Sequence, residues 1–121
     1  MTTPTPRPHL LFLIHSDPRE TARPAEAIRV AAGLGAWKKV DITVYLRGPA
    51  IRALGEWVDE LRDEDNYTRY LPLLAEGGRT LYVQAGATEL DDLGEPSQSF
   101  EPISDDRLAE LAAQCTSVLR F

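Results

Sequence analysis

A short, wholly apolar run that stops abruptly at polar residues places the strongest limit on how this chain folds. It extends from Leu10 to Ile14, and His15 and a turn-forming polar segment follow it before an alanine-rich stretch that begins at Pro24. A run of this length, bounded by turn signals and followed by a helix, is typical of a buried central strand in a parallel sheet. Because ligands bind at the carboxyl ends of the strands in such sheets, we expect the functional site near residues 15–21.

The composition indicates one soluble domain. A chain of 121 residues buries a sufficient core without disulfides or metals, and 43% hydrophobic and 26% charged residues are ordinary proportions. The net charge of −6 argues against nucleic acid and anionic membrane surfaces as partners. A single cysteine, Cys115, excludes an intrachain disulfide, and the apolar run is too short to span a membrane. We expect a cytoplasmic protein with no metal and no cofactor.

The pattern of apolar and turn-forming residues predicts the order of the elements. Residues 1–8, rich in Thr and Pro, are expected to form a disordered tail, followed by a single domain over residues 9–121. Strands are expected at residues 9–15, 40–46, 79–84, 100–103 and 117–121. Helices are expected from Pro24, after Gly48, over 67–76 with Asn66 as a possible cap, and after Ser104. This order predicts an α/β fold, a three-layer α/β/α sandwich with a mostly parallel sheet.

Two details of this prediction concern burial. In the segment 40–46, apolar residues alternate with Asp41, Thr43 and Tyr45, so we expect this strand nearer an edge of the sheet. In the last helix, apolar residues fall at helical spacing and predict one stripe facing the sheet. They are Leu108, Leu111, Ala112 and Cys115.

Four stretches occur in an order shared with a known family. They are residues 11–17 before the alanine-rich helix, Val44-Tyr45-Leu46-Arg47-Gly48, Gly78-Arg79-Thr80-Leu81-Tyr82-Val83, and the ending 103–121. Together they resemble the DsrE/DsrF-like family, which includes the TusD-type sulfur relay subunits, over nearly the full chain after the tail. The resemblance implies a flavodoxin-like sheet of about five strands and a homo-oligomer, often a trimer or a hexamer, with a sulfur-relay protein as a possible partner.

The resemblance also identifies a departure from the family pattern. In active members, a cysteine just after the third strand carries a persulfide between sulfur-transfer partners. The residue that closes that strand here is Gln84, followed by Ala85 and Gly86. An amide cannot form a persulfide, because the chemistry needs a thiolate nucleophile. The protein is therefore expected to be an inactive or repurposed member, and not an enzyme that uses the family mechanism.

Cys115 is the remaining candidate for sulfur chemistry. It could accept sulfur if a neighbouring base lowered its pKa, which would make the protein a persulfide relay acting through Cys115. A relay that relies on a partner's thiol is a related alternative. Against this, the position of Cys115 on the apolar stripe of the last helix favours a buried, structural role.

Other reaction classes lack their motifs. His15, Ser16 and Asp17 are adjacent, so they cannot face one another as a catalytic triad, and no G-x-S-x-G motif is present. Residues 15–21 contain no glycine, which argues against a phosphate-binding loop. His15 remains open as a general base, a ligand contact or a polar strand end bonded to the next turn.

The sequence therefore favours a non-catalytic binding or assembly module that takes a small polar molecule or a segment of a partner. A structural subunit with no small ligand stays open as an alternative. Its pocket is expected where three strands end. The residues expected to edge it are His15, Ser16, Asp17, Arg47, Gly48, Gln84, Ala85 and Gly86.

Overall fold

The structure is a computed structural model that describes residues 7–121, so most of the predicted tail at 1–8 lies outside the described residues. The strands are β1 (His9–Ile14), β2 (Asp41–Leu46), β3 (Leu81–Gln84), β4 (Phe100–Ile103) and β5 (Ser117–Arg120). The α-helices are α1 (Arg23–Trp37), α2 (Glu64–Glu76) and α3 (Asp105–Gln114). Three 3₁₀ segments connect them: η1 (Gly48–Leu54), η2 (Val58–Glu60) and η3 (Thr88–Asp92).

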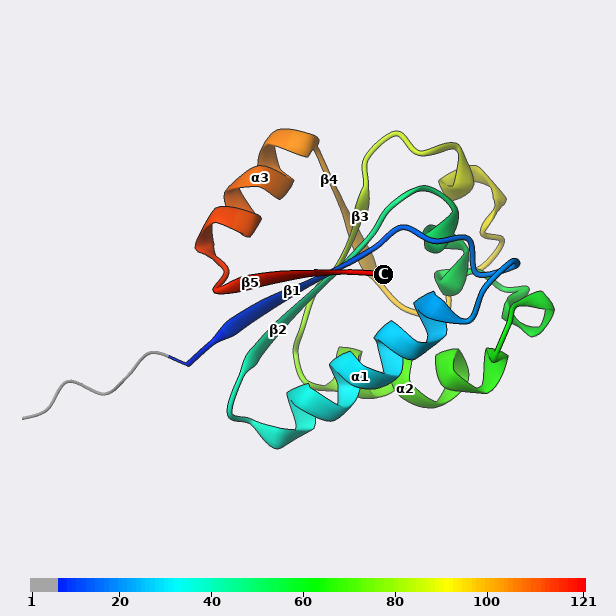
Figure 1. Ribbon diagram of the computed structural model, residues 1–121. Coiled ribbons are helices and arrows are strands. Elements are labelled where there is room, and N and C mark those ends of the chain that lie inside the picture. The colour runs from blue at the N-terminus through cyan, green and yellow to red at the C-terminus, as the bar shows by residue number, and fades with distance from the viewer. Residues whose placement is uncertain (1–6) are drawn as a thin grey trace, which may run out of the picture.

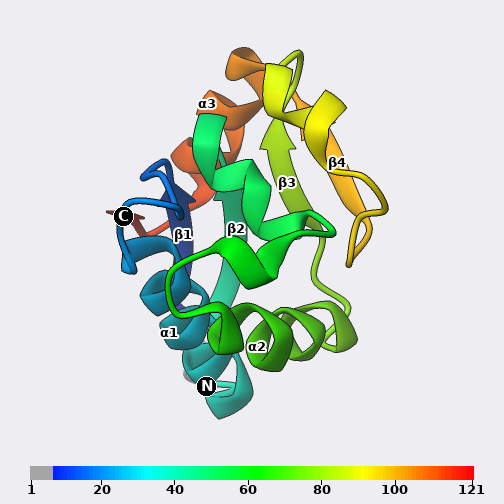
Figure 2. The same cartoon turned by 90° about the vertical axis from the view of Figure 1, so that its right-hand side faces the viewer.

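The five strands form one sheet in the order β4-β3-β2-β1-β5, and every pairing is parallel. Figure 1 shows α3 on one side of the sheet and α1 and α2 on the other, and Figure 2 shows β1 to β4 side by side above these two helices. The predicted three-layer α/β/α sandwich with a flavodoxin-like parallel sheet is confirmed. No helix in the described part of the chain has the length and apolar character needed to cross a membrane.

The apolar run Leu10–Ile14 lies in β1, which has a strand on each side. It pairs with β2 from His9 opposite Asp41 to Ile14 opposite Leu46, and with β5 on its other edge. Successive side chains of a strand point to opposite faces, so a strand covered on both faces needs apolar residues throughout. Phe12 and Ile14 accordingly belong to the core under α1 and α2, whereas Leu11 belongs to the core under α3.

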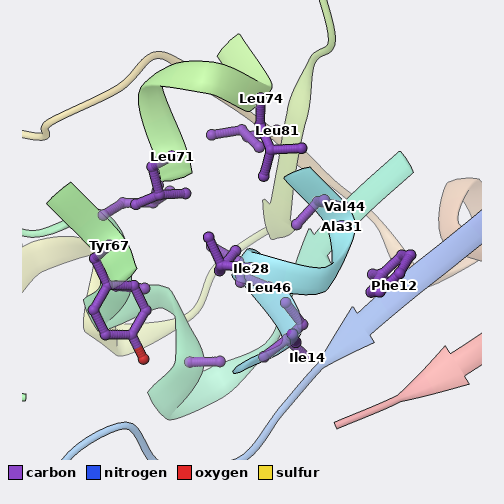
Figure 3. Close-up of a cluster of buried hydrophobic side chains, with 14 of the residues drawn as sticks. Phe12, Ile14, Ile28, Ala31, Val44, Leu46, Tyr67, Leu71, Leu74 and Leu81 are labelled. Carbon is purple, nitrogen blue, oxygen red and sulfur yellow. The ribbon is translucent and has the colours of Figure 1, made fainter. Parts of the chain in front are cut away.

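The larger core fills the space between the sheet and the helices α1 and α2. Figure 3 shows side chains from β1, β2, β3, α1 and α2 meeting there. Among them are Phe12, Ile28, Val44, Leu46, Leu71, Leu74 and Leu81, each at most 2% exposed. On the outer edge, the ring of Phe121 stacks on that of Phe12 with centroids 5.6 Å apart, which joins the end of β5 to β1.

The smaller core lies under α3. Leu111 packs there with Leu11, Tyr45 and Ile103. Leu108, Ala112 and Cys115 are partly buried against the same cluster, so the predicted stripe of α3 does face the sheet. Ser104 begins the helix as expected, because its hydroxyl accepts a hydrogen bond from the backbone N–H of Arg107 at 3.2 Å.

The prediction that the second strand lies near an edge is wrong. β2 is the third of five strands, and Tyr45 on its supposedly exposed face is 0% exposed. The reason is the amphipathic character of tyrosine: its ring packs under α3 while its hydroxyl accepts a hydrogen bond from Arg47 Nη1 at 3.1 Å. Alternation of polar and apolar residues therefore overstated the exposure of this strand.

The helix boundaries also differ in part from the expected ones. The helix predicted after Gly48 is two separate 3₁₀ segments, η1 and η2, broken around Gly55. Helix α2 begins at Glu64 with Asp63 at its cap position, so the predicted cap at Asn66 is wrong. Asn66 lies inside the helix, where its side-chain amide donates a hydrogen bond to the carbonyl of Ala25 and ties α2 to α1.

Arg79 joins the carboxyl ends of α1 and α2. Its Nη2 donates to the carbonyl of Gly35 at 3.0 Å, and the guanidinium lies so close to Gly35 and Gly77 that a Cβ atom at either position would overlap it. A cation at this place also interacts favourably with the negative ends of both helix dipoles. Arg79, which lies just ahead of β3 in the sequence, therefore holds the carboxyl ends of the two helices side by side.

Candidate functional site

A cavity of about 490 Å³ opens on the α3 side of the sheet, at the carboxyl ends of the strands. We call it the strand-end pocket. Its lining residues are Leu13, His15, Arg47, Gly48, Pro49, Gln84, Leu108 and Arg120. They come from the ends of β1, β2, β3 and β5, from the start of η1 and from α3. This is the edge of a parallel sheet at which binding sites are generally found.

Four of the residues named from the sequence line this pocket together: His15, Arg47, Gly48 and Gln84. The other four lie elsewhere along the same edge. The backbone N–H of Ser16 donates to the carbonyl of Phe121, and that of Ala85 donates to the carbonyl of Ile103. Gly86 forms the turn after β3 with a positive φ of 76°.

Asp17, the last of these four, is engaged by its own turn. Its Oδ1 accepts hydrogen bonds from the backbone N–H of Arg19 at 3.0 Å and from Arg19 Nε at 3.1 Å, and its Oδ2 accepts one from Nη2 at 3.0 Å. The hydrogen bond from the Arg19 side chain is the main reason that the pKa of Asp17 lies below its usual value. Asp17 therefore shapes the chain after β1 and does not line the pocket.

Four lining residues were not identified from the sequence: Leu13, Pro49, Leu108 and Arg120. Arg120 reaches the pocket because β5 pairs directly with β1, with Leu13 opposite Arg120. The sequence carries no signal for that neighbour relation. Leu108 could have been placed from its stripe on α3, since the helix that returns from the end of β4 must begin at the carboxyl edge of the sheet.

Gln84 fixes the geometry of the pocket at Gly48. Its Oε1 accepts a hydrogen bond from the backbone N–H of Gly48 at 3.1 Å. Gly48 has a positive φ of 54°, a conformation that glycine adopts without strain. Within residues 7–121, no acceptor contacts the Nε2 group of Gln84, so this group is available to donate to a ligand.

Arg47 has two partners at the pocket. Its Nη1 donates to Asp105 Oδ1 at 2.8 Å and to the hydroxyl of Tyr45 at 3.1 Å. These bonds hold the pKa of Arg47 above and that of Asp105 below their usual values, while burial raises the pKa of Tyr45. The Asp105 side chain is 72% exposed, so this ion pair is screened by water and contributes little stability.

Cys115 lies at the opposite end of the sheet. It ends α3, and the next residue, Thr116, donates its backbone N–H to the carbonyl of His9, the first residue of β1. His15 follows the last residue of β1, so the length of that six-residue strand, about 20 Å, separates the pocket from the thiol. Burial raises the pKa of Cys115, which disfavours the thiolate.

The lining of the strand-end pocket contains one histidine and no cysteine or carboxylate, the side chains that most often bind metal ions. Within residues 7–121, no group of three or more His, Cys, Asp or Glu side chains is arranged to hold one. What the strand-end pocket does provide is a set of hydrogen-bond donors from Arg47, Gln84 and Arg120 above an apolar wall. This arrangement can hold and orient a small molecule, and its lining contains no thiol, hydroxyl or carboxylate that could serve as a nucleophile.

Fold and pocket together define a class: parallel α/β/α domains with a pocket at the carboxyl ends of their strands. Comparison with solved structures supports the fold. The chain is similar to the crystal structure of the ychN protein from E. coli, with a TM-score of 0.75 and 16% sequence identity, over 94% of this chain and 99% of that one. That protein has a DsrE/DsrF-like fold, and at this identity the likeness concerns the fold alone. No family model and no curated protein matches the sequence.

Proposed function

We propose that this protein is a non-catalytic binding module of DsrE/DsrF-like fold that holds a small polar ligand in the strand-end pocket. The observation that carries the proposal is the convergence of His15, Arg47, Gln84 and Arg120, from the ends of four strands, on one cavity. Side chains from such distant parts of the chain meet only through the order of the strands in the sheet. A concave site with an apolar wall and a few directed polar groups is the general form of a small-molecule site.

Two observations favour binding over sulfur transfer. Gln84 stands at the position that a persulfide-carrying cysteine would occupy according to the family resemblance, and its amide is used to hold Gly48. The only thiol, Cys115, lies at the far end of the sheet and has a raised pKa. A relay through Cys115 would therefore need both a different site and an activating base.

The resemblance also leads us to propose that the chain assembles with copies of itself, as a trimer or a hexamer, in the cytoplasm. Large apolar side chains on the surface are consistent with assembly. They are Trp37, Trp57, Leu73 and Val118, between 38% and 61% exposed. Light scattering coupled to size-exclusion chromatography measures the number of subunits, and a monomer at micromolar concentration would contradict this part of the proposal.

The binding proposal is tested with ¹H–¹⁵N spectra recorded against a panel of small acidic, neutral and basic fragments. We expect at least one fragment to shift the amide signals of His15, Gly48 and Gln84 together. The variant Leu108→Trp, which fills the pocket from α3, should abolish these shifts. Ala109→Trp, on the exposed side of the same helix, is the matched control and should leave them unchanged. If no fragment shifts these signals, or if the shifts persist in Leu108→Trp, the proposal is wrong.

The relay alternative has its own measurement. Intact-mass spectrometry after incubation with a persulfide donor is compared for the native protein and Cys115→Ser. We expect no added sulfur on the folded native protein, and labelling of Cys115 only after denaturation. A sulfur adduct on the native protein that the variant lacks would support the relay and contradict the non-catalytic assignment.

A further inference from the structure

The charge of the strand-end pocket is opposite to the charge of the chain. The protein has 19 acidic and 13 basic residues, yet the pocket lining contains two arginines and one histidine and no carboxylate. On a chain with a net charge of −6, the lining itself therefore carries positive charge, and the nearest carboxylate, that of Asp105, lies just outside it and pairs with Arg47. A lining of this charge concentrates anions from solution, because low-dielectric walls focus the field of the charges that line them.

The donors in the pocket suit a planar or tetrahedral anion. Arg47 and Arg120 each carry a guanidinium, whose fork of N–H groups matches the oxygens of a carboxylate or a phosphate. Arg47 directly follows β2 and Arg120 ends β5, and these two strands lie on either side of β1, so the two guanidinium groups reach the pocket from opposite sides. Gln84 Nε2 is a third donor at the end of β3.

The rest of the lining is apolar. Leu13, Pro49 and Leu108 contribute side chains without any hydrogen-bonding group. A fully polar inorganic ion would leave this apolar wall exposed to water. A short apolar group attached to the anion would cover the wall, and the removal of both apolar surfaces from water would add to the binding free energy. The lining therefore favours an anion attached to a small hydrophobic body.

Arg47 already forms an ion pair with one carboxylate, that of Asp105. Asp105 lies outside the pocket lining, in the first turn of α3, and accepts a hydrogen bond from Arg47 Nη1 at 2.8 Å. Asp106 has the same charge and lies in the same turn, but the structure shows no ion pair between it and Arg47 among the described residues. Because the Asp105 side chain is 72% exposed, water can replace Arg47 as its partner at little cost.

From these observations we propose that the strand-end pocket takes a small amphiphilic anion, a carboxylate or a phosphate on a short apolar group, and that Asp105 competes with this anion for Arg47. This inference rests on the proposed binding function of the same pocket. In the free protein Asp105 is the partner of Arg47. In the bound protein the anion of the ligand replaces it and bridges Arg47 and Arg120, while its apolar group lies against Leu108.

The test uses three probes of the same shape and different charge: benzoate, phenyl phosphate and benzamide. Each is titrated into the full chain while the amide signals of His15 and Gly48 are followed. We expect at least one of the two anions to bind and the neutral amide to bind at least tenfold more weakly. Tighter binding of benzoate would identify the ligand's anionic group as a carboxylate, and tighter binding of phenyl phosphate would identify it as a phosphate.

Two variants separate competition from general charge effects. Asp105→Asn should tighten anion binding by about two- to fivefold, because it frees Arg47 from a weak exposed ion pair. Asp106→Asn removes the same charge from the same turn and should change the affinity by a smaller factor. Arg47→Gln should abolish the preference for the anions while leaving the spectrum of the folded domain intact elsewhere.

The outcomes distinguish this inference from the binding proposal on which it rests. Equal binding of benzamide and the anions, or fragment binding confined to neutral or basic compounds, overturns the anion assignment and leaves a binding module. Equal effects of Asp105→Asn and Asp106→Asn overturn the competition. If neither these probes nor any fragment of the panel shifts the pocket signals, both proposals fail together.

Discussion

Replacing Tyr67 with phenylalanine should make this protein more stable. Tyr67 lies on α2 in the larger core and is 1% exposed, and its buried hydroxyl has no hydrogen-bond partner among the described residues (Figure 3). Burial raises the pKa of this tyrosine well above its ordinary value. An unsatisfied buried hydroxyl costs about 1–3 kcal/mol. Tyr67→Phe removes that cost and keeps the ring, so we expect the free energy of unfolding to rise by about 1 kcal/mol.

The measurement is urea denaturation of the native protein and the variant, with a thermal melt as a second readout. A gain of about 1 kcal/mol corresponds to a rise in Tm of about 4 °C for a domain of this size. Tyr70→Phe is the matched control, because Tyr70 stands on the same helix but is only partly buried. We expect the control to change stability by less than about 0.5 kcal/mol.

A loss of stability in Tyr67→Phe would refute this reasoning. It would mean that the hydroxyl has a partner, and a bound water is the first candidate. A small cavity of about 190 Å³ adjoins Tyr67 and Pro72 and could hold one. In that case the variant would lose a satisfied hydrogen bond, which costs about 1 kcal/mol.

Arg79, Gly48 and Asp17 each lead to a prediction about stability. Arg79→Ala should lower the free energy of unfolding by about 1 kcal/mol in a urea titration, because it removes the hydrogen bond to the Gly35 carbonyl and the cation at two helix ends. Gly48→Ala should cost about 1–2 kcal/mol from its positive φ alone, since nothing obstructs the added Cβ, whereas Gly33→Ala inside α1 should cost nothing or stabilise. Asp17 has a folded-state pKa below its unfolded value of 3.8, so its contribution is present above pH 3.8 and lost as the pH falls through the folded value. The native protein should therefore exceed Asp17→Asn in stability at pH 7, and a difference that persists unchanged at pH 2 would contradict this.

The sequence alone predicts those strands and helices in which a single pattern of residue types dominates. The unbroken apolar run of β1 predicts a strand that is buried on both faces. The helical spacing of Leu108 and Leu111 predicts that one face of α3 is buried. Ser104 before two acidic residues defined the start of that helix. In each case local physics and the tertiary structure agree, so the pattern could be interpreted without knowledge of the neighbours.

The prediction failed where long-range neighbours decide the outcome. A tyrosine is compatible with either environment, so the alternation in β2 predicts a more exposed face for Tyr45. Only the cover by α3 and the hydrogen bond from Arg47 determine its burial. Arg120 was missed because its place in the site depends on β5 lying beside β1. The closeness of Asp17 to His15 in the sequence predicts a place at the pocket, but the turn that Asp17 forms with Arg19 uses its carboxylate.

The pairing of β1 with β5 has a consequence for kinetics. It joins His9 to Thr116 across 107 positions, and Arg120 enters the pocket only when this pairing is complete. Contacts between such distant segments form slowly, since the chain must lose much of its freedom before they are made. We therefore expect β5 to join the sheet late in folding, and a ligand that bridges Arg47 and Arg120 would hold this edge strand in place. Such a ligand should prolong the lifetime of the folded state by slowing unfolding, with little effect on the rate at which the domain folds.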